Sequence, residues 1–231
     1  DSLTFFQRRL ERDPGQYQSL KAVAHVYTAV GEFDQAARVY ETILGTEPDR
    51  VDAAISAARL KSQFYGKAAQ AQRLLKSFID ANGDLPAVQI ARVLTERAAC
   101  LRLMGQRKKA MELVSQALEK DPMNVVALYL RAVLELETGQ VAKSIAHLRE
   151  MRSHMPDEPR VLAWLAIAEG QVPNYESALR NLRRALELSI NDLDLYFIMG
   201  AVNLDLDNVN RAYTWLRKGT EISPFYSRDH R

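Results

Sequence analysis

Apolar residues in the stretch 17–50 recur at intervals of three and four residues, which is the spacing of one helix face. A first stripe consists of Leu20, Val23, Ala24 and Tyr27, and a second of Ala36, Tyr40 and Ile43. Gly31 lies between the stripes, where a tight turn favours a residue that tolerates left-handed backbone. The pattern predicts two helices joined by a short turn.

This two-helix pattern recurs with a fixed period of about 34 residues. Small residues keep the interval at Ala110, Ser144, Ala178 and Ala212, and prolines keep it at Pro122, Pro156 and Pro224. A fixed period of this length is the sequence signature of a helical solenoid. The predicted units are a half unit at 1–16, full units at 17–50, 52–85, 91–124, 125–158, 159–192 and 193–226, and a tail at 227–231, in one continuous solenoid domain.

Three places depart from the regular pattern. The unit 52–85 keeps its phase only after a one-residue slip, and about five extra residues follow it in the segment 80–90, which predicts a longer loop or an extended following helix. Val172-Pro173-Asn174 replaces the turn glycine, so that turn is expected to differ in geometry. Gly200 lies mid-helix, at a cost of about 1 kcal/mol against alanine unless close packing requires it.

The spacing resembles that of the tetratricopeptide repeat family nearly place for place. The residues that carry the resemblance are Leu20, Ala24, Tyr27, Gly31, Ala36, Tyr40 and Pro48. The resemblance covers almost the whole chain and implies an all-α fold, a right-handed superhelical α-solenoid of antiparallel helix pairs with about six full repeats plus an N-terminal half repeat. It also implies a non-catalytic interaction scaffold or adaptor.

In this family the first helices line a concave groove, through the second, fifth, ninth, twelfth and thirteenth places of each unit. The second unit holds Ala53, Ser56, Leu60, Gln63 and Phe64 there. The residues expected to contact a partner are Arg92, Arg102, Val126, Tyr129, Val133, Leu136, Arg160, Ile167, Phe197, Ala201 and Leu204. Lys21 stands where family members that clamp a terminal carboxylate have lysine, but His25 replaces the asparagine, which argues against that ligand.

The expected groove is apolar from the fourth unit onward, and Arg92, Arg102 and Arg160 flank the apolar part. This combination suits a peptide or amphipathic helix with apolar anchors and acidic residues. The alternative is that the apolar residues pack against neighbouring first helices.

The charge composition argues against a nucleic-acid partner. Lys plus Arg is 31 and Asp plus Glu is 29, without the basic surplus of a nucleic-acid binder. The single cysteine, Cys100, excludes an intrachain disulfide and a zinc site built on thiolates, and its place in a helix predicts a buried hydrophobe. No apolar run reaches the roughly 18 residues of a membrane span. The compartment stays open, with the cytoplasm favoured over a periplasmic or membrane-tethered location.

No sequence motif for catalysis or cofactor binding is present, since phosphate-loop, dinucleotide and nucleophile-elbow patterns are absent. His147, Glu150 and His154 share a helix face; a solvated polar face is the preferred interpretation and a metal site the alternative. The basic run 107–109 is interpreted as a solvated helix start, with a docking patch as the alternative. We therefore expect no enzyme activity, metal or cofactor.

A structural role is the second hypothesis. Neither end of the array carries a recognisable polar capping helix, so self-association or assembly within a larger protein or envelope complex could use the ends around Phe5, Phe6 and Trp215. The two tryptophans, Trp164 and Trp215, are expected to be packing residues.

Overall fold

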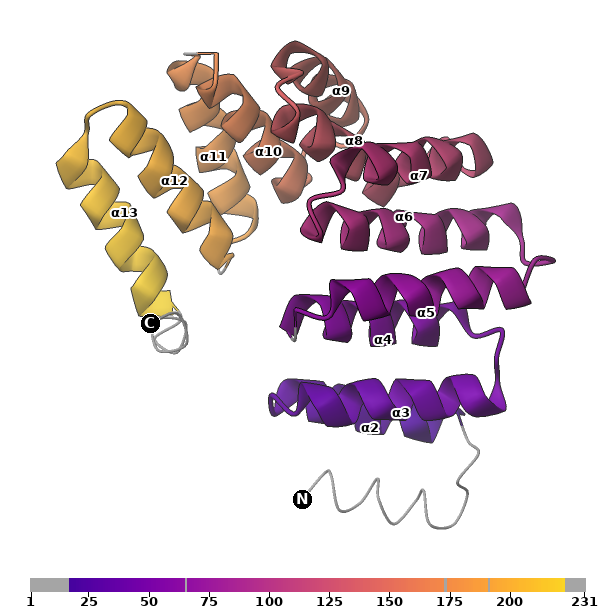
Figure 1. Ribbon diagram of the computed structural model, residues 1–231. Helices are drawn as coiled ribbons and strands as arrows, with labels where there is room; N and C mark the ends of the chain where they lie inside the picture. The colour runs from indigo at the N-terminus through magenta and orange to yellow at the C-terminus, as the bar shows by residue number, and fades with distance from the viewer. Residues whose placement is uncertain (1–16, 65, 173, 191, 223–231) are drawn as a thin grey trace. The chain divides into compact units, whose positions relative to one another are not determined.

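The computed structural model describes residues 17–64, 66–172, 174–190 and 192–222, all of whose regular elements are α-helices (Figure 1). The predicted half unit 1–16, with Phe5 and Phe6, and the tail 227–231 lie outside these ranges. The predicted all-α repeat array is confirmed. The helices fall into two compact units, residues 1–130 and 131–231, and each is described by itself.

The first unit consists of paired helices that stack in chain order (Figure 1). They are α2 (Tyr17–Ala29), α3 (Phe33–Thr46), α4 (Val51–Phe64), α5 (Ala68–Ala81), α6 (Ala87–Leu103), α7 (Arg107–Lys120) and the start of α8 (Val125–Glu137). The pairs α2–α3, α4–α5 and α6–α7 each pack internally, and α3 contacts α4 as α5 contacts α6. The direct contact between α4 and α6 places first helices next to each other.

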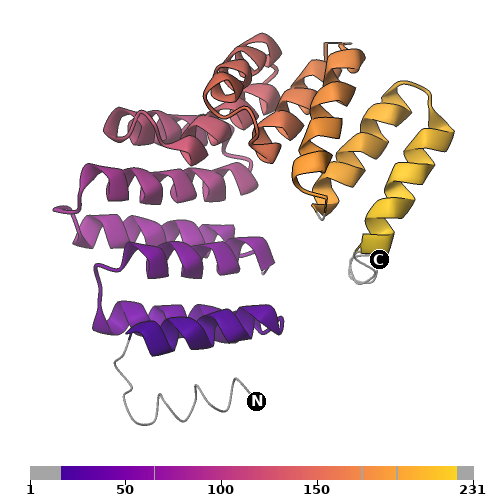
Figure 2. The same cartoon turned by 180° about the vertical axis from the view of Figure 1, so that it is seen from behind.

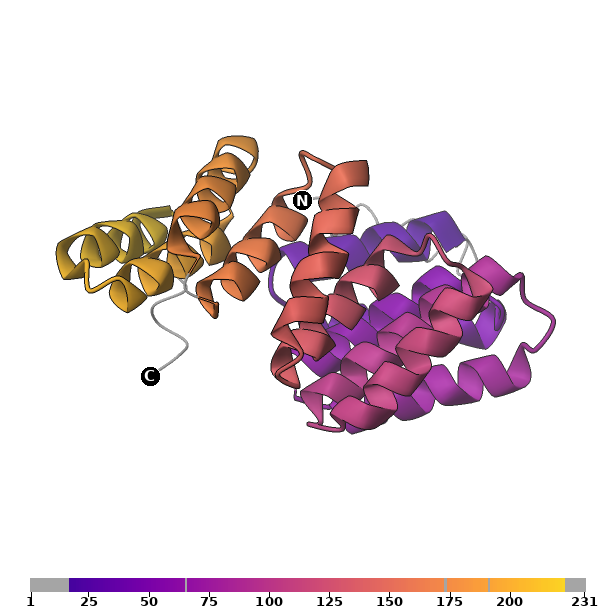
Figure 3. The ribbon, with the colours of Figure 1, turned by 90° about the horizontal axis from the view of Figure 1, so that it is seen from above.

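The second unit repeats the arrangement (Figure 2). It holds the end of α8 and then α9 (Val141–His154), α10 (Pro159–Gly170), α11 (Tyr175–Leu188), α12 (Leu193–Asp205) and α13 (Val209–Ile222). Helices α10 and α11 pack as one pair and α12 and α13 as another, and α12 and α13 (yellow in Figure 3) lie side by side. Their shared core contains Leu182, Tyr196 and Met199, with Trp215 packed against it. This contact agrees with the predicted packing role of Trp215.

The turns inside the pairs close in the same way along the chain. Gly31, Gly66, Gly105 and Gly139 have positive φ, and Asp207 takes the same left-handed conformation at φ 58°. Asparagine and aspartate are the non-glycine residues that enter this region most readily, so Asp207 can replace the glycine. In the Val172-Pro173-Asn174 turn the Asn174 N–H still donates to Glu169 O at 3.0 Å. Pro173 lies outside the described residues, and the expected difference in turn geometry stays a prediction.

The structure locates the two irregular segments. Helix α4 begins one full repeat period after α2, whereas Gly66 comes one position later than a full period after Gly31. The additional residue therefore lies between the start of α4 and its turn, and groove-facing places in α4 come one residue earlier than the predicted phase suggested. Four of the five extra residues after this unit, 87–90, lengthen the following helix, since α6 has 17 residues and the connection before it spans only 82–86. The extended-helix alternative is confirmed.

Gly200 lies against the partner helix of its own pair. A Cβ at this position would be 2.7 Å from both Cγ and Cδ2 of Leu216 on α13. Gly45 lies in the helical backbone of α3, and a Cβ added there would have no neighbouring atom within 4 Å. The close packing expected around the mid-helix glycine Gly200 is therefore present, whereas Gly45, in the last turn of α3, has no such neighbour.

These two glycines give opposite expected effects on stability. Gly45→Ala should raise the free energy of unfolding by up to about 0.5 kcal/mol, because alanine favours the helix even in its last turn and nothing obstructs its methyl group. Gly200→Ala should lower it by about 1–3 kcal/mol, because the methyl group overlaps the branch point of Leu216. Urea denaturation of both variants measures the effects. A stabilised Gly200→Ala variant would contradict the packing described for α12 and α13.

Candidate functional site

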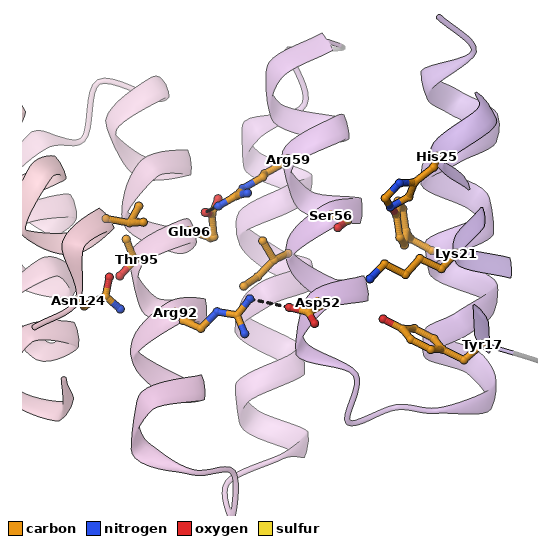
Figure 4. A pocket seen from close by; sticks show the side chains of 13 residues that line it. Tyr17, Lys21, His25, Asp52, Ser56, Arg59, Arg92, Thr95, Glu96 and Asn124 are labelled. Carbon is orange, nitrogen blue, oxygen red and sulfur yellow. Dashed lines mark hydrogen bonds and ion pairs between the residues drawn. The ribbon is translucent and has the colours of Figure 1, made fainter. Parts of the chain in front are cut away.

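The first helices of the first unit line a hollow of about 370 Å³, which we call the first-helix groove (Figure 4). Its walls come from α2, α4 and α6, with contributions from α3 and from the start of α8. The lining residues are Tyr17, Lys21, His25, Tyr40, Asp52, Ile55, Ser56, Arg59, Arg92, Thr95, Glu96, Asn124 and Val126. Most of these side chains are polar or charged.

Two ion pairs cross the groove from α4 to α6. Arg92 Nη2 lies 2.5 Å from Asp52 Oδ1, and the Arg59 Nε–H donates to Glu96 Oε1 at 2.9 Å. The Glu96 side chain is only 12% exposed, whereas that of Asp52 is 57% exposed. The hydrogen bond from Arg59 to Glu96 raises the pKa of the Arg59 guanidinium, against the opposing effect of burial. Both arginine charges are thus balanced within the free protein.

Lys21 is the groove cation without an ion-pair partner among the described residues. Its Nζ lies 5.8 Å from the centre of the Tyr17 ring, and the same ring receives Arg50 at 4.5 Å. In Figure 4 the ammonium end of Lys21 is directed from α2 toward the part of α4 that carries Asp52. The groove therefore presents one uncompensated positive charge beside a phenol.

The neutral polar groups of the groove are largely used inside the protein. The Thr95 hydroxyl donates to Ala91 O at 2.8 Å, and Asn124 Oδ1 accepts from the Ala127 N–H at the start of α8 at 3.0 Å. Burial raises the pKa of the Tyr40 phenol, and its hydrogen bond with Ser56 acts in the opposite direction. These contacts fix the groove walls before any partner arrives.

The structure distributes the predicted contact residues over both units. Arg92 and Val126 line the first-helix groove, while Arg102 and Tyr129 are half-buried elsewhere in the first unit. In the second unit Arg160, Ala201 and Leu204 are exposed, and Ile167 and Phe197 are half-buried. Contact of these residues with a partner stays a prediction.

Val133 and Leu136 do not offer a free surface. They are 1% and 6% exposed, so solvent barely reaches them. A first helix inside an array packs against its own second helix and against neighbouring repeats, which buries more than one of its faces. For these two residues the structure favours the alternative interpretation, that they belong to the core.

Sequence reasoning missed seven of the lining residues, among them the four that carry the ring contact and the ion pairs described above, namely Tyr17, Asp52, Arg59 and Glu96. Asp52 and Arg59 were displaced by the one-residue irregularity of α4, and their expected counterparts Ala53 and Leu60 are buried. If the second unit is started one full period of 34 residues after Tyr17, at residue 51, its second and ninth places are Asp52 and Arg59. Glu96 lies next to a predicted groove place, and its role depends on Arg59, 37 residues away.

Of the other candidate centres, His147 has an internal partner, Cys100 is buried and the basic run is exposed. His147 Nδ1 lies 2.8 Å from Glu135 Oε2, and no group of three possible metal ligands occurs in the described part of the chain. Cys100 is buried as predicted, and burial raises the pKa of its thiol to about 11. The run 107–109 is exposed at the first turn of α7, in agreement with a solvated helix start. In the described ranges, no helix combines the length and apolar character of a membrane span.

Comparison with known proteins agrees with this architecture. Models of the tetratricopeptide repeat match residues 19–54 and 101–168. Cellulose synthase operon protein C of Pseudomonas fluorescens (strain SBW25) is 26% identical over 175 residues, which are 74% of this chain and 14% of that protein. The chain thus spans only a small part of this curated relative.

Solved structures show the same fold. A tetratricopeptide repeat protein from Parabacteroides merdae ATCC 43184 has a TM-score of 0.77 at 16% identity, over 96% of this chain and 85% of that one. A chain of the APC/C hetero-tetramer Cut9–Hcn1 has a TM-score of 0.75 at 18% identity, over 96% of this chain and 43% of that one. With the repeat matches and the paired helices, these findings show that the chain is a tetratricopeptide repeat protein.

The two groove ion pairs should differ in their contribution to stability. Arg59→Ala leaves Glu96 buried without its partner and should lower the free energy of unfolding by about 1–3 kcal/mol. Arg92→Ala breaks an exposed pair and should cost about 0–1 kcal/mol. Urea denaturation compares the two variants with the parent protein. Equal effects would contradict the difference in burial between Glu96 and Asp52.

Cys100 should react slowly in the folded protein. At pH 8, well below a thiol pKa of about 11, very little thiolate forms and the side chain is buried. Modification by a chromogenic disulfide reagent should therefore be at least about tenfold slower in buffer than in denaturant. Rapid labelling of the folded protein at pH 8 would contradict this assignment.

Proposed function

We propose that this protein is a non-catalytic scaffold whose first-helix groove binds an extended or helical segment of a partner protein. Tetratricopeptide repeats are typical of protein–protein interaction scaffolds, and the APC/C hetero-tetramer Cut9–Hcn1 shows the fold in a multi-protein complex. The observation that carries the proposal is the groove itself. Side chains from three successive first helices converge on one hollow of about 370 Å³, as is usual for a binding surface.

The charges of the groove favour a partner segment with at least one acidic residue. Arg59 and Arg92 are neutralised by Glu96 and Asp52, so the net attraction comes from Lys21. A partner carboxylate near Lys21 would gain a charge-assisted hydrogen bond without breaking either internal ion pair. Val126, at the end of the groove, is 51% exposed and offers an apolar contact to the same segment.

A displayed library of random peptides selected on the parent protein tests the groove. Lys21→Glu should weaken the selected peptides about tenfold or more, because it replaces attraction by repulsion. Lys108→Glu, on the exposed first turn of α7, makes the same charge change outside the groove and should leave the affinity within about twofold. Fluorescence anisotropy with labelled peptides measures both.

Substitutions in the predicted apolar positions distinguish binding there from binding in the first-helix groove. If Tyr129→Glu or Phe197→Glu abolishes binding while Lys21→Glu does not, the partner occupies the predicted apolar positions and not the first-helix groove. Peptide affinities that survive all three substitutions, with circular dichroism still helical, would reject groove binding altogether.

A second candidate function follows from the similarity to cellulose synthase operon protein C. That similarity covers 74% of this chain and favours an assembly module that acts within a longer polypeptide. Such a module would self-associate or co-purify with the cellulose-synthesis machinery of the source organism. A strict monomer in light scattering at high concentration, together with no co-purification, would count against it.

A further inference from the structure

A second hollow lies between the second helices of the second unit, at α11 and α13, with α12 as its floor. We call it the second-helix cleft; its volume is about 300 Å³. The floor consists of the buried Met199 and Asn203. The walls are Leu179 and Arg183 from α11 and Arg211, Thr214, Trp215 and Lys218 from α13. The lining holds three cationic side chains and no acidic one.

The same position one repeat earlier is filled by a carboxylate of the chain itself. Glu169 on α10 is 1% exposed, and its Oε1 accepts from Arg149 Nη2 on α9 at 2.9 Å. Its Oε2 accepts from Asn181 Nδ2 on α11, also at 2.9 Å. Arg152 Nη1 then donates to Asn181 Oδ1 at 3.2 Å. A carboxylate between two second helices is thus held by an arginine on one side and an amide on the other.

Counting one repeat period forward maps this network onto the second-helix cleft. Arg149 corresponds to Arg183, Glu169 to Asn203 and Asn181 to Trp215. The arginine is retained, but the carboxylate is replaced by an amide whose N–H donates to Met199 O at 2.8 Å. Among the described residues neither Arg183 nor Arg211 has an ion-pair partner. The cleft keeps the cationic half of the pair and lacks the anionic half.

Trp215 gives the cleft a defined shape. Its ring lies 6.1 Å from that of Tyr196, tilted by 48°, and Lys218 Nζ lies 4.7 Å from its centre. The indole is half-buried and packs against the core formed by α11 and α12, and this packing fixes its position. A flat apolar wall between Lys218 and the opposite Arg183 suits the methylene groups of an acidic side chain.

We propose that the second-helix cleft binds an acidic segment of a partner protein, with an aspartate or glutamate carboxylate seated on Arg183 against Trp215. The partner carboxylate gives Arg183 the ion-pair partner that Glu169 gives Arg149 one repeat earlier. Arg211 and Lys218 add attraction for neighbouring acidic residues. This surface is formed by second helices and is therefore separate from the first-helix groove, so the two proposals can succeed or fail independently.

The corresponding cleft in the first unit has a different lining. Its lining includes the polar residues Gln72, Arg97, Lys109 and Glu112 and the apolar residues Leu101 and Leu113. Leu101 stands where Asn203 does, and the counterpart of Arg183 is Lys76, which pairs with Asp80 at 3.0 Å. Glu112 offsets one of the two positive charges of that lining, which are those of Arg97 and Lys109. The cleft of α11, α12 and α13 differs in having three cations, no acid and an indole wall.

The probe is a labelled peptide of alternating aspartate and glutamate with blocked ends, compared with the matching asparagine–glutamine peptide and with inorganic phosphate. Trp164→Phe leaves Trp215 as the only tryptophan, so its emission reports on the cleft directly. The acidic peptide should bind saturably, change the emission of Trp215 and weaken as salt is added. The amide peptide and phosphate should not compete at the same concentrations.

Two variants decide the assignment. Arg183→Glu should weaken the acidic peptide about tenfold or more, and Asn203→Glu should do the same by supplying an internal carboxylate, as Glu169 does. Arg180→Glu, an equal charge change at an exposed position of α11 outside the cleft, should have less than about a twofold effect. Unchanged binding in both cleft variants would overturn the proposal. So would phosphate or the amide peptide binding as tightly as the acidic peptide.

Discussion

The close approach of the two helices in each pair is the constraint on which the array depends. On the first helices it is met by Ala24, Ala58, Ala98, Ala132, Ala166 and Gly200, and on the second helices by Ala36, Ala71, Ala110, Ser144, Ala178 and Ala212. The described side chains at these places are at most 1% exposed. Ser144 is the one polar member, and its hydroxyl donates to Ala132 O at 2.8 Å. Because a larger side chain would separate the helices, this contact fixes the phase of every unit.

Most of the fold could be predicted because this constraint leaves a periodic trace in the sequence. The small residues, the turn glycines and the prolines each repeat, and together they indicated the helix pairs and the family. What they did not locate is the residue added within the unit of α4. A one-residue change rotates a helix by about 100°. It therefore left the fold prediction intact, while two of the expected groove residues of α4, Ala53 and Leu60, lie on the buried face.

The site was harder to predict because its chemistry depends on pairs of residues that are distant in sequence. Arg92 looked like an open docking charge, yet it is balanced by Asp52, 40 residues earlier. Burial likewise depends on neighbours, and Val133 and Leu136 look like groove residues only until the helices around α8 are considered. Periodicity identifies which residues share a face. It does not say which of them have already been paired or covered by another repeat.

A repeat array supplies its own comparison for such questions, because equivalent places face equivalent neighbours. Equivalent places of the first helix and its partner, twelve residues apart, hold the hydrogen-bonded pairs Glu135–His147 and Glu169–Asn181, and then Asn203 and Trp215, which line one cleft. Because the three pairs stand at equivalent places of the repeat, their side-chain chemistry can be compared directly. The first two contain a buried acid that is satisfied internally, and the third does not. A residue that differs from its equivalents in the other repeats, as Asn203 differs from Glu135 and Glu169, is therefore the most informative sign of a binding surface in this protein.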